Sequence, residues 1–151
     1  MKIQIRPMAV ADAAAVTVLY TQLGYPASTA EMERRIQRLV GSDNHIALVA
    51  EDASGRVIGC IQVQGQHLLE YRPFAEIAGV VVDEACRGQG VGKALLAGAE
   101  DWAREQGYPR LLVHTNTIRT RAHRFYEREG YRVEKSQYVF SKELLPTSFE
   151  S

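Results

Sequence analysis

Cysteine is scarce in this sequence, and its two copies lie far apart. The 151 residues include two cysteines, Cys60 and Cys86, and four histidines, His45, His67, His114 and His123. The cysteines lack the short spacing of zinc ligands, and the histidines form no cluster with them. We therefore expect no metal ion, and we expect both thiols to be free in a reducing compartment.

An excess of charge of one sign is also missing. Lysine and arginine together number 18, and aspartate and glutamate together number 18, so the formal net charge is zero. Proteins that bind nucleic acid or a membrane surface through general electrostatics carry a basic excess. The balance argues against a nucleic-acid partner and against a membrane partner.

Long hydrophobic runs are absent as well. The longest uninterrupted runs, such as residues 78–82, are far shorter than the roughly 20 residues that a membrane-spanning helix needs. Met1 and Lys2 lead into a strand-like alternation rather than into the pattern of a signal peptide. We therefore expect a cytoplasmic protein.

The length and the apolar content suit one folded domain. A chain of 151 residues buries roughly two-thirds of the surface that it exposes when unfolded. Apolar residues make up 46% of the chain and charged residues 24%, which is ordinary for globular proteins and excludes disorder. We expect a single domain over residues 1–145 and a flexible tail over residues 146–151.

The periodicity of apolar residues predicts the order of helices and strands. Alternation predicts strands, whereas apolar residues three and four apart predict amphipathic helices. Gly24 suits a left-handed helix end, and Ser28 with Glu31 forms a capping box. The predicted strands span residues 2–6, 45–51, 57–64, 76–82, 111–115 and 131–140, and the predicted helices residues 10–23, 28–40, 91–106 and 119–129.

The strand at residues 76–82 leads into the most informative segment of the sequence. This run is apolar and rich in β-branched residues, so we expect a central strand buried on both faces. Arg87-Gly88-Gln89-Gly90-Val91-Gly92-Lys93 follows it and opens a long helix. The first N–H groups of a helix are unpaired and carry partial positive charge, and glycines let phosphate oxygens approach them closely. The turn therefore predicts an anion site.

Two familiar phosphate-binding motifs do not fit this turn. A Walker A loop needs Ser or Thr after its lysine, but Ala94 follows Lys93. A dinucleotide-binding fingerprint that starts at Gly88 needs glycine where the chain has Lys93. Both ATP binding through a Walker loop and nicotinamide binding are thus disfavoured.

Two motifs together resemble the GCN5-related N-acetyltransferase family. Residues 87–92 match Q/R-x-x-G-x-G/A, the loop that holds the pyrophosphate of acetyl-CoA in that family. Residues 122–131 (Ala-His-Arg-Phe-Tyr-Glu-Arg-Glu-Gly-Tyr) resemble its A-x-x-F-Y-x-x-x-G-[FY] segment. The resemblance extends over residues 3–140. It implies an α/β (α+β) fold with a mixed central sheet of six to seven strands, about four helices, and central strands that splay apart.

The same resemblance implies which residues bind acetyl-CoA. The N–H groups of the glycine-rich turn would hold the pyrophosphate, and main-chain atoms of the central strand would pair with the pantetheine arm. An asparagine after the next strand often contacts the cofactor in this family, although it also suits a turn. One or two arginines between residues 119 and 128 would meet the ribose phosphate. The implied binding residues are Val80, Val81, Val82, Arg87, Gly88, Gln89, Gly90, Val91, Gly92, Lys93, Asn116 and Phe125.

The catalytic groups implied by the resemblance are Tyr126 and Glu76. A phenol with its ordinary pKa of about 10 is protonated at neutral pH and can protonate the departing sulfur. Periodicity alone would make Tyr126 a core aromatic. An alkylammonium with a pKa of about 10.4 must lose a proton before it attacks, and some members of the family place a base where Glu76 lies. A solvent-facing role for Glu76, or His114 or His67 as the base, stays open.

The sequence and the resemblance together predict an acetyl-CoA-dependent N-acetyltransferase. Both substrates would bind before a primary amine of a small molecule or peptide attacks the thioester directly, without either cysteine acting as nucleophile. The acceptor would lie against residues 20–38 and 66–75, whose acidic and aromatic side chains suit a cationic small molecule. A non-catalytic acyl-CoA-binding regulatory module is the alternative. Related proteins often dimerise, which makes a homodimer the assembly to test.

Overall fold

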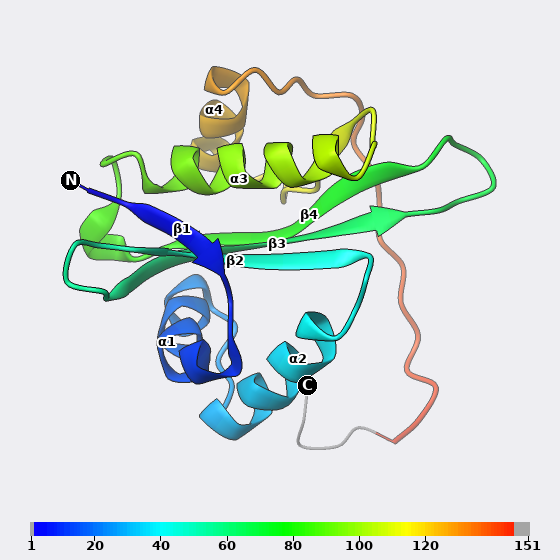
Figure 1. Ribbon diagram of the computed structural model, residues 1–151. Helices are drawn as coiled ribbons and strands as arrows, with labels where there is room; N and C mark the ends of the chain where they lie inside the picture. Colours follow the sequence, from blue (N-terminus) through cyan, green and yellow to red (C-terminus); the bar gives the residue numbers. More distant parts are fainter. Residues whose placement is uncertain (1, 147–151) are drawn as a thin grey trace. The chain divides into compact units, whose positions relative to one another are not determined.

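A computed structural model describes residues 2–146 of the chain (Figure 1). These residues form two compact units, one that ends at His114 and one that begins at Thr115. Apart from Pro146, the tail expected at residues 146–151 lies outside the described residues. No helix among residues 2–146 is long and apolar enough to cross a membrane.

The first unit is built on a mixed sheet of five strands in sequential order. The first four strands run antiparallel to their neighbours, whereas the last pair is parallel. The mixed sheet agrees with the expected fold class, with fewer strands than the six or seven expected. The strands are β1 (Gln4–Pro7), β2 (His45–Glu51), β3 (Val57–Gln66), β4 (Phe74–Val82) and β5 (Leu111–Val113).

Helices cover both faces of this sheet (Figure 1). One face carries α1 (Ala13–Leu23), which follows the short turn η1 (Val10–Asp12), and α2 (Thr29–Val40); the other carries α3 (Val91–Glu105). The predicted helix ends are confirmed. Gly24 has φ 99° and ends α1, and the Ser28 side chain accepts a hydrogen bond from the Glu31 N–H at 3.1 Å.

Apolar side chains fill the space on each side of the sheet. Towards α1 and α2, Val49 and Cys60 belong to one buried cluster with helix residues such as Leu19. Towards α3, Gly59 leaves room for the helix, because a Cβ there would lie 3.0 Å from Val91 Cγ1 and 3.1 Å from Leu95 Cδ1. The sheet is therefore packed between two helical layers.

β4 is not buried on both faces along its whole length, so that prediction is wrong. Ala78 is exposed, and Val80 and Val82 are only half-buried. β5 pairs with β4 only from Ala75 to Ile77, and beyond this point no described strand lies along that edge of β4. We call the place where the Ile77–Val113 pair ends the fork. The expected splaying of the central strands is present in this form.

The second unit contains one helix, α4 (Thr120–Arg128). Gly130, with φ 94°, follows its C-terminal end. The strand predicted over residues 131–140 is wrong, because residues 131–146 form neither helix nor strand. Tyr138, Val139 and Phe140 are exposed. High β-propensity means only that the side chains suit a strand. A strand forms only where a neighbouring backbone pairs with it.

Candidate active site

The glycine-rich turn follows a segment at the end of β4 that is fixed by the contacts of Asp83. Asp83 is buried; its N–H donates to the Ile58 carbonyl at 2.9 Å, and its carboxylate accepts from the Ala85 N–H at 3.1 Å. The same carboxylate pairs with the guanidinium of Arg56. These bonds fix the short turn η2 (Glu84–Cys86) and hence the direction in which the glycine-rich segment leaves the sheet.

Two glycines in left-handed conformations shape the turn itself. Gly88 has φ 77° and Gly90 has φ 86°, values that side chains of L-residues resist. A Cβ at either position would meet nothing within 4 Å, so the backbone conformation, rather than crowding, calls for glycine here. Gly90 is also the N-cap residue of α3.

The N-terminus of α3 presents backbone donors without helical acceptors. The first helical hydrogen bond runs from the Ala94 N–H to the Gly90 carbonyl at 3.0 Å. The N–H groups of Val91, Gly92 and Lys93 precede it and have no acceptor within the helix. Together with the partial positive charge of the helix end, they suit an anion. The Val91 side chain itself is buried in the core.

The open edge of β4 carries the main-chain groups of Val80 and Val82. The Asp83 N–H bonds to β3 through Ile58, and backbone groups in an antiparallel strand alternate between its two sides. Val81 therefore also bonds towards β3, opposite Cys60. Of the three valines expected to face the pantetheine arm, Val80 and Val82 direct their N–H and C=O groups to the free side.

The candidate base Glu76 has partners on both oxygens. Its Oε1 accepts from Gln66 Nε2 at 3.2 Å, and its Oε2 lies 3.2 Å from Nδ1 of His114. His114 is the residue directly after β5, so this pair joins β4 to the chain that leaves β5. The structure thus brings together two of the three candidate bases. His67 instead lies 3.2 Å from the Tyr108 hydroxyl.

Tyr20 of α1, the first residue of the predicted acceptor region, contacts β4 just beyond the fork. The register pairs Gln62 with Gly79 and Val63 with Ile77, so Ala78 is the extra residue of a β-bulge. A Cβ on Gly79 would lie 2.7 Å from the Tyr20 hydroxyl. Burial raises the pKa of Tyr20, which keeps the phenol protonated. Helical spacing alone assigns this tyrosine to the core, so the sequence carried no signal for its contact with β4.

The remaining candidates lie in the second unit, which is described by itself. Tyr126 is buried, and its ring centroid lies 5.1 Å from that of Phe125 and 5.8 Å from that of Tyr131. Burial raises the pKa of Tyr126 to about 12, against an opposing effect of Arg119. The phenol is therefore protonated at neutral pH.

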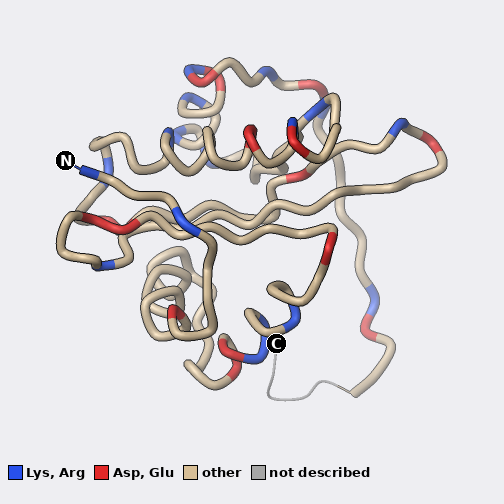
Figure 2. Tube along the Cα trace, in the orientation of Figure 1, with Lys and Arg blue, Asp and Glu red and all other residues tan. Residues whose placement is uncertain are grey.

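The side chain and the carbonyl group of Asn116 are both hydrogen-bonded within the turn that precedes α4. Its side-chain oxygen accepts from the Ile118 N–H at 3.2 Å, and its carbonyl accepts from the Arg119 N–H at 3.0 Å. These are the bonds of a turn asparagine. The arginines at 119, 121, 124 and 128 are exposed, and the acidic residues Glu127 and Glu129 flank the last of them in the sequence; basic and acidic residues lie close together in this segment (Figure 2).

Both cysteines are free and buried. Burial raises the pKa of the Cys60 thiol to about 12, so this thiol is not a nucleophilic thiolate at neutral pH. Residues 2–146 contain no group of three histidine, cysteine, aspartate or glutamate side chains that could hold a metal ion.

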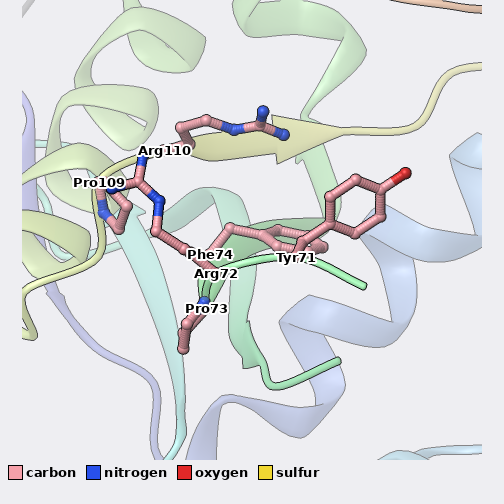
Figure 3. A pocket seen from close by; sticks show the side chains of 6 residues that line it. All are labelled: Tyr71, Arg72, Pro73, Phe74, Pro109 and Arg110. Atoms are coloured by element: carbon pink, nitrogen blue, oxygen red, sulfur yellow. The ribbon is translucent and has the colours of Figure 1, made fainter. Parts of the chain in front are cut away.

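A shallow pocket lies at the start of β4, within the expected acceptor region (Figure 3). Its volume is about 120 Å³. The Tyr71 and Phe74 rings meet edge to face at 6.3 Å, and the Arg110 guanidinium lies 6.0 Å from the centroid of Phe74. Ligand pockets commonly enclose about 300 Å³ or more, so this one suits only part of a ligand. The lining residues are Tyr71, Arg72, Pro73, Phe74, Pro109 and Arg110.

Comparison with known sequences points to one family. Residues 13–131 match the family model described as the acetyltransferase (GNAT) family. Over 92 residues the chain is 42% identical to an aminoalkylphosphonate N-acetyltransferase of Salmonella typhimurium, a match that covers 60% of this chain and 58% of that protein. The chain therefore spans little more than half the length of this relative.

A second relative and a solved structure match over nearly the whole chain. An aminoglycoside N(6')-acetyltransferase type 1 of Stenotrophomonas maltophilia is 28% identical over 148 residues, 95% of each chain. The structure of the aminoglycoside N-acetyltransferase AAC(6')-Iy in complex with CoA superposes with a TM-score of 0.82 at 18% identity, and covers 95% of this chain and 96% of that one.

Proposed function

The chain belongs to the acetyltransferase (GNAT) family, and on this premise we propose that it transfers the acetyl group of acetyl-CoA to a primary amine of a small molecule. The observation that carries the proposal is the continuity of two features. The open edge of β4, with the main-chain groups of Val80 and Val82, leads through a short turn to the free donors at the start of α3. An extended amide-containing arm that ends in a pyrophosphate matches both.

The donor supplies an acetyl group activated as a thioester. In our proposal the N–H groups from Gly88 to Lys93 hold its pyrophosphate, with the exposed Arg87 side chain beside it. The amides of its pantetheine arm pair with Val80 and Val82. This binding mode directs the thioester along β4 from Val82 towards the fork, where the bulge at Ala78 interrupts the regular strand.

Tyr126 is the proposed acid for the departing sulfur. Its buried phenol is protonated at neutral pH, since its pKa is about 12, so it is in the form that can donate a proton to the departing sulfur. Phe125 supports the ring through an edge-to-face contact. Asn116 and the exposed arginines before and within α4 remain proposed contacts of the donor.

The acceptor amine must be deprotonated for its attack. Glu76 and the imidazole of His114 are the proposed start of this proton path, because Glu76 Oε2 lies 3.2 Å from Nδ1 of His114. Because the amine attacks the thioester directly, the step requires no acyl-enzyme, which accords with two buried thiols.

The acceptor is proposed to be a small amine. The curated relatives are named for aminoalkylphosphonate and aminoglycoside substrates, and both classes present primary amines. The acceptor region includes Glu31, Glu33 and Glu70, which would favour a cationic molecule. We also propose a cytoplasmic location, no nucleic-acid or membrane partner, and a homodimer that size-exclusion chromatography with light scattering would test.

A calorimetric titration with acetyl-CoA, followed by thiol release against a panel of amines, tests the proposal. We expect binding, and we expect turnover with at least one small amine. Tyr126→Phe should retain acetyl-CoA affinity within about twofold and lose kcat by on the order of a hundredfold. Binding without turnover on any amine would favour the alternative, an acyl-CoA-binding regulatory module. Absence of binding would contradict the assignment of residues 87–93.

A further inference from the structure

We propose that Nε2 of His114 accepts the proton of the acceptor amine, and that Glu76 is a positioning residue that orients this imidazole. The inference rests on the proposed acetyl transfer and specifies its base. It starts from the contact between the Glu76 carboxylate and Nδ1 of His114, at 3.2 Å.

The contact assigns the tautomer of His114. An ionised carboxylate has no hydrogen to donate and repels a nitrogen lone pair, so its position 3.2 Å from Nδ1 favours the tautomer with the hydrogen on Nδ1. In the neutral imidazole the lone pair is then on Nε2. Gln66 holds the other carboxylate oxygen at 3.2 Å and so restrains the rotation of the Glu76 side chain. The three residues form a chain that leads from β3 through β4 to the imidazole.

Access to substrate favours the imidazole over the carboxylate. The His114 side chain is 66% exposed, whereas that of Glu76 is 17% exposed. None of residues 2–114 forms a hydrogen bond with Nε2. An amine can therefore approach Nε2 directly, while its approach to Glu76 is limited by the two side chains already bound to the carboxylate.

The position of His114 matches the proposed path of the thioester. Val113 pairs with Ile77 as the last pair of β4 and β5, and His114 follows it at the fork. Ala78, the bulged residue, lies next along β4. If the pantetheine arm occupies the open edge from Val82 inward, its reacting end points towards the fork, where the imidazole is.

The residues named account for every proton that moves in the step. The neutral amine forms a bond from its nitrogen to the carbonyl carbon, and the bond from that carbon to sulfur breaks. The amine proton passes to Nε2, and the Glu76 carboxylate stabilises the imidazolium. Tyr126 protonates the sulfur, and the imidazolium proton returns to the tyrosinate through solvent. The products are an N-acetyl amine and CoA with a free thiol.

His114→Ala tests the inference in the thiol-release assay. We expect kcat to fall by on the order of a hundredfold or more, with acetyl-CoA affinity by calorimetry within about twofold of the wild type. Added imidazole or 4-methylimidazole should restore part of kcat in His114→Ala, because it can reach this exposed position from solvent and accept the proton. Such rescue would not follow from a purely structural role. His45→Ala is the matched control and should keep wild-type kcat, because the His45 ring lies at the start of β2 and contacts Ser42 and Gln64.

Glu76→Gln separates positioning from direct base catalysis. If Glu76 positions His114, kcat should fall between about tenfold and a hundredfold, less than in His114→Ala, without rescue by imidazole. His114→Asn keeps a polar side chain at this exposed site, so it shows whether a folding defect explains the loss in His114→Ala. It should be as slow as His114→Ala.

Two results would overturn the inference while leaving the acetyltransferase proposal intact. One is wild-type kcat in His114→Ala together with loss of activity in Glu76→Gln, which would make Glu76 the direct base. The other is a slow His114→Ala enzyme that imidazole does not rescue at any concentration. Absence of turnover in the wild type with every amine would instead refute the proposed function itself.

Discussion

The two halves of β4 differ in their pairing, although their side chains are of similar character. From Ala75 to Ile77 the strand has neighbours on both sides, and beyond the fork it pairs with β3 alone. Ile77 is buried in the paired half, whereas Val80 and Val82 are half-buried in the open half. The comparison teaches that a strand with one free edge can keep a side chain in the core, as Val81 does, while Val80 and Val82 offer a main-chain binding edge.

The largest effect should come from shortening a core residue opposite the open half. Ile61 of β3 is Val80's register partner, but it is 1% exposed. Ile61→Ala should lower the free energy of unfolding by about 2–5 kcal/mol, whereas Val80→Ala should cost about 1 kcal/mol. Urea denaturation measures both. Equal losses would mean that Val80, on the open half of β4, is packed as tightly as its core partner Ile61.

Gly90→Ala should weaken acetyl-CoA binding by about tenfold. Forcing Ala into the left-handed region costs about 1–2 kcal/mol, and relaxation of the turn would misdirect the N–H groups that follow it. Calorimetry gives the affinity.

Gly107→Ala is the matched control for the glycine-rich turn. Gly107 has φ 82°, close to the 86° of Gly90, but it lies beyond the other end of α3. It should lose as much stability as Gly90→Ala and keep the wild-type affinity for acetyl-CoA. A comparable loss of affinity in Gly107→Ala would mean that general strain in α3, rather than the turn, controls binding.

Acid should remove a stabilising contribution at β1, the outer strand on the far side of the sheet from β5. Asp12 binds Arg6 through two bonds of 2.8 and 2.9 Å and accepts from the Ala9 N–H at 2.7 Å. The bonds to Arg6, together with the Ala9 N–H, hold the pKa of Asp12 below its usual range. This contribution is therefore fully present above the unfolded-state pKa, near 3.9, and is lost as the pH falls through the lower folded-state pKa.

Asp12→Asn tests this pH dependence. It should cost about 1–2 kcal/mol at pH 7, and the difference from the wild type should shrink steadily below about pH 4. Urea denaturation at several pH values measures it. A difference that is the same at pH 7 and pH 3 would show that lost packing, not charge, accounts for the cost.

The smallest effect is expected when a thiol reagent is added, because both thiols are buried. Cys60 pairs with Val81, and burial raises its pKa to about 12; Cys86 is buried too. The native protein should not react with a thiol reagent within minutes, while both cysteines should react in denaturant. Rapid native labelling that acetyl-CoA suppresses would place a thiol at the open edge.

Some site residues could be read from the sequence because their signals are local. The glycines at 88 and 90 and the helix start after them follow from dihedral preferences and from unpaired helix donors, which act within a few residues. Glu76 and Tyr126 were identified only through the family resemblance, and their catalytic roles stay predictions. The contact of Tyr20 with Gly79 could not be predicted, since the helical spacing of Tyr20 is that of any core residue and the contact depends on packing.

The sequence by itself determined the helix ends at Gly24 and Ser28, the glycine-rich turn and most strands, because capping bonds and backbone preferences are properties of neighbouring residues. Only the tertiary structure decided where β4 loses its partner, which of its valines face the free side, and that residues 131–146 form no strand. It also brought Gln66 and His114 to Glu76. Strand pairing joins backbones that are distant in the chain, so a local pattern cannot specify it.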